Sequence, residues 1–226
     1  MLVAPIDLVP FLCKATGRCC IHNLVILSSF DIFRIGKTLG ASAKELFTKK
    51  LITYRINPSN FWMEPILNSK TNSTCPFLFR EVDANTEQYL CEIYESRPLV
   101  CRIYPLKYDK DNSVFMRFLP AEHRCFECIT TENNPTLEDY LNTSNVNELL
   151  EEFNQYLALL DRIFASGMNL EKIKKNKTAQ KKFFEIQSIL YETYPEKENT
   201  LDKLPFEEME SRVNEILDKT EFDVKN

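Results

Sequence analysis

"CKATGRCC", residues 13–20, places three cysteines within eight positions and sets the last two side by side. Thiols this close together serve as a disulfide framework, as buried apolar side chains or as metal ligands. Neighbouring side chains of an extended chain point to opposite faces. Cys19 and Cys20 therefore both act as ligands only if the chain turns here, which Gly17 permits, or if they bind two separate metal positions. Otherwise one of the pair is a small buried side chain.

The cysteines are confined to the first 128 residues; they are Cys13, Cys19, Cys20, Cys75, Cys91, Cys101, Cys125 and Cys128. The N-terminal stretch lacks the basic segment and the cleavage site of a signal peptide, so we expect a cytoplasmic protein. A reducing compartment disfavours structural disulfides, although the even number of cysteines keeps that alternative open. Clustered thiols in an intracellular protein are typical of metal ligands or redox centres.

The charge and hydropathy exclude two classes of partner. The 226 residues carry a net charge of −5 and a sequence pI of about 5.3, which provides no basic field for nucleic acid. The one concentrated basic run, residues 172–182, is typical of a solvated helix face. No apolar stretch approaches the roughly 20 residues of a membrane span. We therefore expect neither a nucleic acid nor a membrane as partner.

The composition divides the chain into two parts. Residues 1–130 carry the cysteines, whereas residues 136–226 are rich in Glu, Lys and Leu, and the turn-forming stretch TTENNPT (130–136) separates them. We predict a cysteine-cluster metal-binding domain over 1–130 and a helical extension that packs on it over 136–226. The expected fold class is α+β and α-rich, with an irregular core that metal rather than apolar packing organises.

Capping residues and periodicity predict the individual elements. Residues 28–40 begin with serines and end at a glycine, and residues 42–51 begin with a capping box, so each stretch predicts a short helix. Residues 52–56 and 114–119 alternate weakly and predict short strands, with irregular cysteine-bearing segments between them. Apolar residues at helical spacing predict three further helices within 145–167, 178–195 and 205–220.

The spacing of the cysteines leaves the metal open. Zinc sites usually take two C-x2–4-C pairs, each of which holds two corners of a tetrahedron. Here the only C-x2-C pair is Cys125 and Cys128. The other spacings match neither a zinc ribbon or finger nor the cysteine runs of bacterial and plant ferredoxins.

Two later blocks, CPFL (75–78) and CEIYESRPLVCRIYPL (91–106), follow the first cysteine block. Together the blocks resemble the YkgJ-type cysteine-cluster family, also called the CxxCxxCC family, which is described as a zinc- or iron-chelating domain. The family pattern C-x-I-Y-x-x-R-P-x-x-C-R is matched from Cys91 to Arg102, whereas Thr16 stands where the family carries its second cysteine. The resemblance covers about residues 10–110 and implies chelation, foremost of an iron–sulfur cluster.

The resemblance implies a set of metal ligands, namely Cys13, Cys19, Cys20, Cys75, Cys91 and Cys101. Further candidates, which would take the place of the missing cysteine, are Cys125, Cys128 and His22. Arg97 and Arg102 flank the last two ligands, and a guanidinium there would donate to sulfur and raise the reduction potential of a cluster. In the alternative, Arg97 pairs with Glu92 or Glu95 and Arg102 lies on the surface.

The function implied by the resemblance is metal chelation, with a redox or electron-transfer role and a helical part available to a protein or redox partner. A structural zinc module for protein–protein interaction is one alternative. A cluster-dependent methyltransferase-like enzyme is another, because one branch of the family contains flagellin lysine N-methylases. Catalytic residues do not follow from the sequence, which has no H-E-x-x-H motif, no G-x-S-x-G motif and no glycine-rich nucleotide loop. Whether the protein is an enzyme therefore stays open at this stage.

Overall fold

The structure of the chain is a computed structural model that describes residues 2–3, 7–9, 11, 14, 16–21, 24–70, 73–82, 87–109, 114–117, 128, 134–143, 145–168, 170–193 and 206–218. It forms two compact units, each built from two separate stretches of sequence. Unit 1 comprises Met1–Val25 and Leu67–Glu151, and unit 2 comprises Ile26–Ile66 and Glu152–Asn226. In the described part of the chain, no helix combines the length and the apolar character that crossing a membrane would require.

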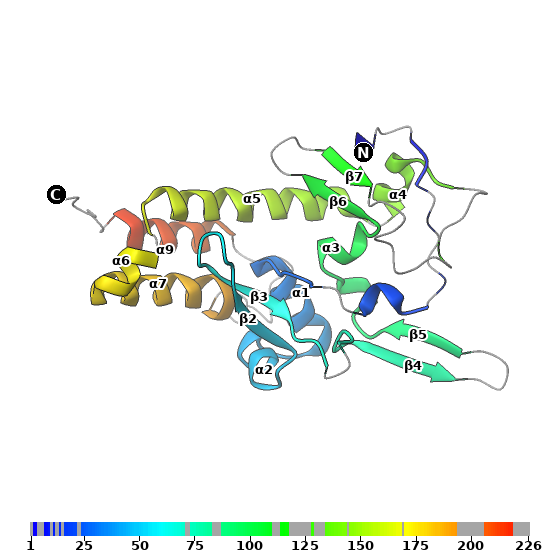
Figure 1. Cartoon of the computed structure of the whole chain (residues 1–226), viewed down its shortest axis with the longest axis horizontal. Coiled ribbons are helices and arrows are strands. Elements are labelled where there is room, and N and C mark those ends of the chain that lie inside the picture. The colour runs from blue at the N-terminus through cyan, green and yellow to red at the C-terminus, as the bar shows by residue number, and fades with distance from the viewer. Residues whose placement is uncertain are drawn as a thin grey trace. The chain divides into compact units, whose positions relative to one another are not determined.

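Unit 1 combines a three-stranded antiparallel sheet, in the order β1-β7-β6, with a separate hairpin and short helical turns (Figure 1). In the sheet, Leu2 pairs with Met116 and Leu106 pairs with Arg117. In the hairpin β4–β5, Leu78 pairs with Cys91. The described elements are β1 (Leu2–Val3), η1 (Arg18–Cys20), β4 (Leu78–Val82), β5 (Glu87–Cys91), η2 (Tyr94–Ser96), α3 (Leu99–Arg102), β6 (Leu106–Asp109), β7 (Val114–Arg117) and α4 (Leu137–Thr143).

The interior of unit 1 is apolar. Phe77, Ile93, Leu99 and Leu106 are each at most 5% exposed. The prediction of irregular cysteine-bearing segments is wrong, because the hairpin β4–β5 runs through them and ends at Cys91. The α+β, α-rich class is confirmed, whereas an irregular core that metal organises is not what the described residues show.

Unit 2 is mainly helical. It contains one two-stranded sheet, β2–β3, and the part of α5 (Val146–Ala165) from Glu152 onward. A π turn, η5 (Ile189–Thr193), extends α7. The other elements are α1 (Ser29–Leu39), α2 (Ala43–Thr48), β2 (Ile52–Ile56), β3 (Met63–Leu67), α6 (Leu170–Lys175), α7 (Lys177–Ser188) and α9 (Phe206–Asp218).

Local caps fix the first two helices of unit 2 as predicted. At the start of α1, the Ser28 hydroxyl accepts a bond from the backbone N–H of Asp31 at 3.2 Å, and the Asp31 carboxylate accepts one from the backbone N–H of Ser28 at 2.8 Å. The helix ends at Gly40, whose φ of 58° is left-handed. Ser42 and Glu45 form the same reciprocal box at the start of α2.

An aromatic core joins the two sequence stretches of unit 2. Trp62 meets the rings of Phe164 and Phe183 edge-on, at centroid distances of 5.5 and 5.3 Å. Its indole N–H donates to the Tyr191 hydroxyl at 2.8 Å, and that hydroxyl lies 2.6 Å from the hydroxyl of Tyr156. Residues 26–66 therefore pack with the C-terminal helices, and the predicted boundary at 130–136 does not coincide with the division into units.

Candidate metal centre

A single turn of 3₁₀ helix brings the two adjacent cysteines to the same side of the chain. Gly17 precedes this turn with a φ of 68°, and its carbonyl accepts a hydrogen bond from the backbone N–H of Cys20 at 2.9 Å. The Sγ atoms of Cys19 and Cys20 lie 3.8 Å apart. The turn that the sequence required for two neighbouring ligands is thus present.

Gly17 is required for a second reason, which is the close approach of β5. A Cβ atom added to Gly17 would lie 2.7 Å from the Cβ of Tyr89, well inside van der Waals contact. Thr16 also forms an isolated parallel bridge with Tyr89. The first cysteine block is therefore held directly against the strand that ends at Cys91.

Backbone hydrogen bonds connect the first block to the second. The N–H of Cys75 donates to the carbonyl of Cys20 at 2.7 Å, and Ile21 forms an antiparallel bridge with Thr74. The carbonyl of Cys75 accepts from the N–H of Leu78 at 3.2 Å, and Leu78 faces Cys91 across the hairpin. Three segments that are far apart in sequence thus bring their thiols to one place.

A compact turn after β5 positions the last cysteine of the pocket, Cys101. Pro98 caps α3, and its carbonyl accepts from the N–H of Cys101 at 2.9 Å. The guanidinium of Arg102 closes the same turn by donating to the backbone carbonyls of Arg97, at 3.0 Å, and Glu95. Arg102 therefore braces the backbone between the last two cysteines, and it is not among the residues found to line the pocket described next.

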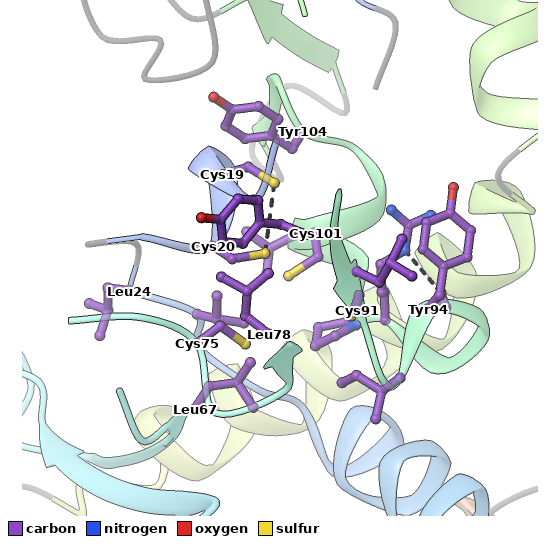
Figure 2. A pocket seen from close by; sticks show the side chains of 18 of the residues that line it. Cys19, Cys20, Leu24, Leu67, Cys75, Leu78, Cys91, Tyr94, Cys101 and Tyr104 are labelled. Atoms are coloured by element: carbon purple, nitrogen blue, oxygen red, sulfur yellow. Dashed lines mark hydrogen bonds between the residues drawn. The ribbon is translucent and has the colours of Figure 1, made fainter. Parts of the chain in front are cut away.

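The five described thiols outside position 128 form no disulfide and are partly exposed, and they line one pocket of about 290 Å³ in unit 1 (Figure 2). The pocket walls are mostly apolar, and they include Leu24, Val25, Leu67, Leu78, Leu90, Ile93, Val100 and Leu106. Among the residues that the structure describes, no three acidic, histidine or cysteine side chains already stand close enough to hold a metal ion. The pocket gathers a soft donor set without closing it into a finished coordination sphere.

Hydrogen bonds between thiols shift their ionisation. A hydrogen bond from Cys20 lowers the pKa of Cys19 to about 7 and also lowers the pKa of Cys75. The same bonds, together with burial, raise the pKa of Cys20 above its ordinary value. Burial raises the pKa of Cys91. A thiophilic metal ion binds sulfur as thiolate, so it would displace the protons that these sulfur atoms share.

Arg97 supplies positive charge to the pocket. Its guanidinium lies over the ring of Tyr94, 3.7 Å from the centroid, and its Nε donates to the Tyr94 carbonyl at 2.9 Å. This charge favours the thiolate forms of both Cys19 and Cys91 by Coulombic attraction. Of the two arginines predicted near the sulfur atoms, Arg97 faces the pocket, whereas Arg102 binds backbone carbonyls.

Of the other predicted ligands, only Cys128 lies among the described residues, and it does not line this pocket. Cys13, Cys125 and His22 lie outside the described residues. Cys128 is 1% exposed and disulfide-bonded, which differs from the expectation that disulfides are disfavoured. Its sulfur accepts a weak bond from the backbone N–H of Lys14 at 3.5 Å.

Sequence reasoning missed part of the apolar wall of the pocket. Leu24 and Leu67 belong to no cysteine motif, and no pattern in the sequence identifies them. Tyr89 stands two residues before Cys91, so strand alternation puts both on one face, but β5 was not predicted. Recognition of the strand would have identified Tyr89.

A known protein family matches the first half of the chain. The model of the CxxCxxCC family, which bears the description "Putative zinc- or iron-chelating domain", matches residues 12–126. The matched range is about half of the chain and includes every cysteine except Cys128. No curated protein and no solved structure shows significant similarity to the chain.

Proposed function

Because the chain belongs to the CxxCxxCC family of zinc- or iron-chelating domains, we propose that the thiol pocket of unit 1 is its metal centre and that it holds an iron–sulfur cluster. The ligands would come from the five thiols that line the pocket, namely Cys19, Cys20, Cys75, Cys91 and Cys101. Thiolate sulfur suits zinc, copper(I) and iron–sulfur clusters, and carboxylate-preferring ions such as magnesium are poor occupants.

The observation that carries the proposal is the convergence on one cavity of thiols from separate segments, none of them in a disulfide. Cys20 and Cys75 are linked through the backbone, and β4–β5 pairing brings Cys91 to the same wall. Unit 1 has an apolar core of its own, so these thiols are not needed as packing residues. Reduced thiols gathered where packing does not require them point to ligation.

The size of the cavity favours a polynuclear occupant. In a tetrahedral zinc site the four sulfur atoms stand about 3.8 Å apart around one ion, so the ion fills the space between them. A cavity of about 290 Å³ is larger than the space at the centre of such a site. The cavity has room for several iron and sulfide ions, and five available thiols exceed the four of a closed zinc site.

The charge of Arg97 supports a thiolate-rich centre. Several thiolates around a metal carry net negative charge, which the pocket must compensate because its walls are apolar. Arg97 already favours the thiolate forms of Cys19 and Cys91. A positive charge next to a cluster stabilises its more reduced, more negative state, so a redox role is part of the proposal.

The test is metal and acid-labile sulfide analysis of the full chain purified without oxygen. The proposal expects iron and sulfide in comparable amounts, with broad visible absorption from thiolate-to-iron charge transfer. Iron-free, sulfide-free protein that also fails to take up iron and sulfide on anaerobic reconstitution would contradict it.

One observation favours zinc as the second candidate. A tetrahedral site with zinc–sulfur bonds of about 2.3 Å has sulfur–sulfur edges of about 3.8 Å. Cys19 and Cys20 have this Sγ–Sγ separation. Colourless protein with about one zinc ion per chain would select this candidate, and the site would then be structural rather than redox-active.

A further inference from the structure

One side of the thiol pocket holds Tyr94 and Arg97 together with Cys91. Figure 2 shows Tyr94 on the Cys91 side of the pocket, with Cys19 and Cys20 toward the other side. Arg97, which stacks over Tyr94, is the only charged residue among the described residues that line the pocket. The pocket therefore joins the side of Cys19 and Cys20 to a side, near Cys91, that carries one fixed positive charge.

The position of Arg97 is held by its own neighbours. Ring stacking on Tyr94 and the bond from Nε to the Tyr94 carbonyl fix the plane of the guanidinium. In the described part of the chain, its two Nη groups donate to no protein acceptor. A guanidinium fixed in this way presents paired N–H groups that match the two oxygens of a carboxylate.

The walls beside this charge are apolar and open to solvent. Tyr94 and Val100 line the pocket, yet they are 49% and 42% exposed. Exposed apolar side chains around the mouth of a cavity gain free energy when an apolar ligand covers them. A small inorganic anion would use the charge and leave these walls exposed.

We infer that the Arg97 end of the pocket binds a small organic monocarboxylate with an aromatic or aliphatic body, beside the metal centre. The carboxylate receives a bidentate bond from the Nη groups of Arg97, and the body lies against Tyr94 and Val100. The inference rests on the proposed function, which supplies the metal next to the ligand. A molecule bound at Arg97 would lie within reach of that metal.

The experiment titrates benzoate into the full chain by calorimetry, with benzamide as the uncharged probe of the same shape. Wild-type protein should bind benzoate at least about tenfold more tightly than benzamide, because hydrogen bonds to a charged group are worth about 1.5–3 kcal/mol, or roughly tenfold to 150-fold in affinity. Arg97→Lys keeps the charge beside the thiols and removes the planar fork, so benzoate affinity should fall severalfold, and Arg97→Gln should abolish the preference for benzoate. Arg80→Gln, which changes an exposed arginine of β4 outside the pocket, is the matched control and should bind like wild type.

Equal affinity for benzoate and benzamide in the wild-type chain would overturn the inference, as would wild-type benzoate affinity in Arg97→Gln. Loss of benzoate binding on metal loading would also overturn it, because the cavity would then be only the room of the cluster itself. Metal content, measured on the same samples, separates the two proposals. Metal-free protein that binds benzoate through Arg97 contradicts only the metal centre, and metal-loaded protein that ignores benzoate contradicts only the carboxylate site.

Discussion

Gly17 determines where the first two thiols lie, because both its backbone and its lack of a side chain are used. Its φ of 68° is costly for residues with a Cβ, and the added atom would collide with Tyr89. The sequence indicated the turn through Gly17, but it gave no sign of the approach of β5, because that contact depends on a hairpin paired across the chain.

Gly17→Ala should therefore destabilise unit 1 by about 2 kcal/mol or more and lower the metal content of the purified protein. Gly40→Ala is the matched control, since Gly40 has a similar φ of 58° but nothing within 4 Å of an added Cβ. It should cost only about 1 kcal/mol and leave the metal content unchanged. Denaturant unfolding and metal analysis give both numbers, and equal effects of the two substitutions would show that the contact with Tyr89 is unimportant.

Single thiols are the second residue-scale test. Cys91→Ser and Cys101→Ser should each abolish or strongly reduce metal binding, because a serine hydroxyl is a poor ligand for thiophilic metals. Ser96→Ala changes the same segment without touching the pocket, and its loss of a buried hydroxyl should cost only about 1 kcal/mol. Metal content per folded chain is the measurement. Wild-type metal content in both serine variants would refute the ligand assignment.

At the scale of helices and strands, elements with local signals were predictable and elements without them were not. The capping boxes and glycine stop of α1 and α2 depend on residues three or four positions apart, so the sequence displays them directly. The hairpin β4–β5 shows no such signal. Four of the five β4 residues are exposed, so burial imposes no alternation of apolar and polar residues on the strand.

The two capping boxes differ in burial, which predicts different energies. Ser28 and Asp31 are 2% and 3% exposed, whereas the Ser42 box lies at the surface. Ser28→Ala should destabilise unit 2 by about 1–2 kcal/mol, because the buried N–H donor that it leaves unpaired cannot form a hydrogen bond with water instead. Ser42→Ala should cost about 0.5–1 kcal/mol. Chemical denaturation measures both. A larger loss in Ser42→Ala than in Ser28→Ala would contradict the assigned burial.

At the scale of the whole molecule, the chain alternates between its two units instead of completing one before the other. The predicted boundary at 130–136 followed a change in composition, which registers only neighbours in sequence. The packing of Trp62 with Phe183 and Tyr191 joins residues more than 100 positions apart, and no local pattern predicts it. The sequence displays the family motif because the residues of each block are close together in the chain. The cavity that the blocks form could not be predicted, because it depends on contacts between distant segments.

A chain shortened to residues 1–130 should consequently fail to form a stable domain. It would retain 26–66 without the helices that cover Trp62 and Phe30, so large apolar side chains would face solvent. We expect aggregation or a non-cooperative thermal transition, while the full chain unfolds cooperatively. Cooperative unfolding of the 1–130 chain, with full metal content, would contradict the division into units.

The central claim is that Cys19, Cys20, Cys75, Cys91 and Cys101 together hold one metal centre. The most direct test is anaerobic alkylation of metal-loaded full chain, read thiol by thiol by mass spectrometry before and after a chelator. The account predicts that at least four of these five thiols are protected together and become reactive together when the metal is removed. Equal alkylation of all five thiols in the loaded and the chelated protein would contradict it.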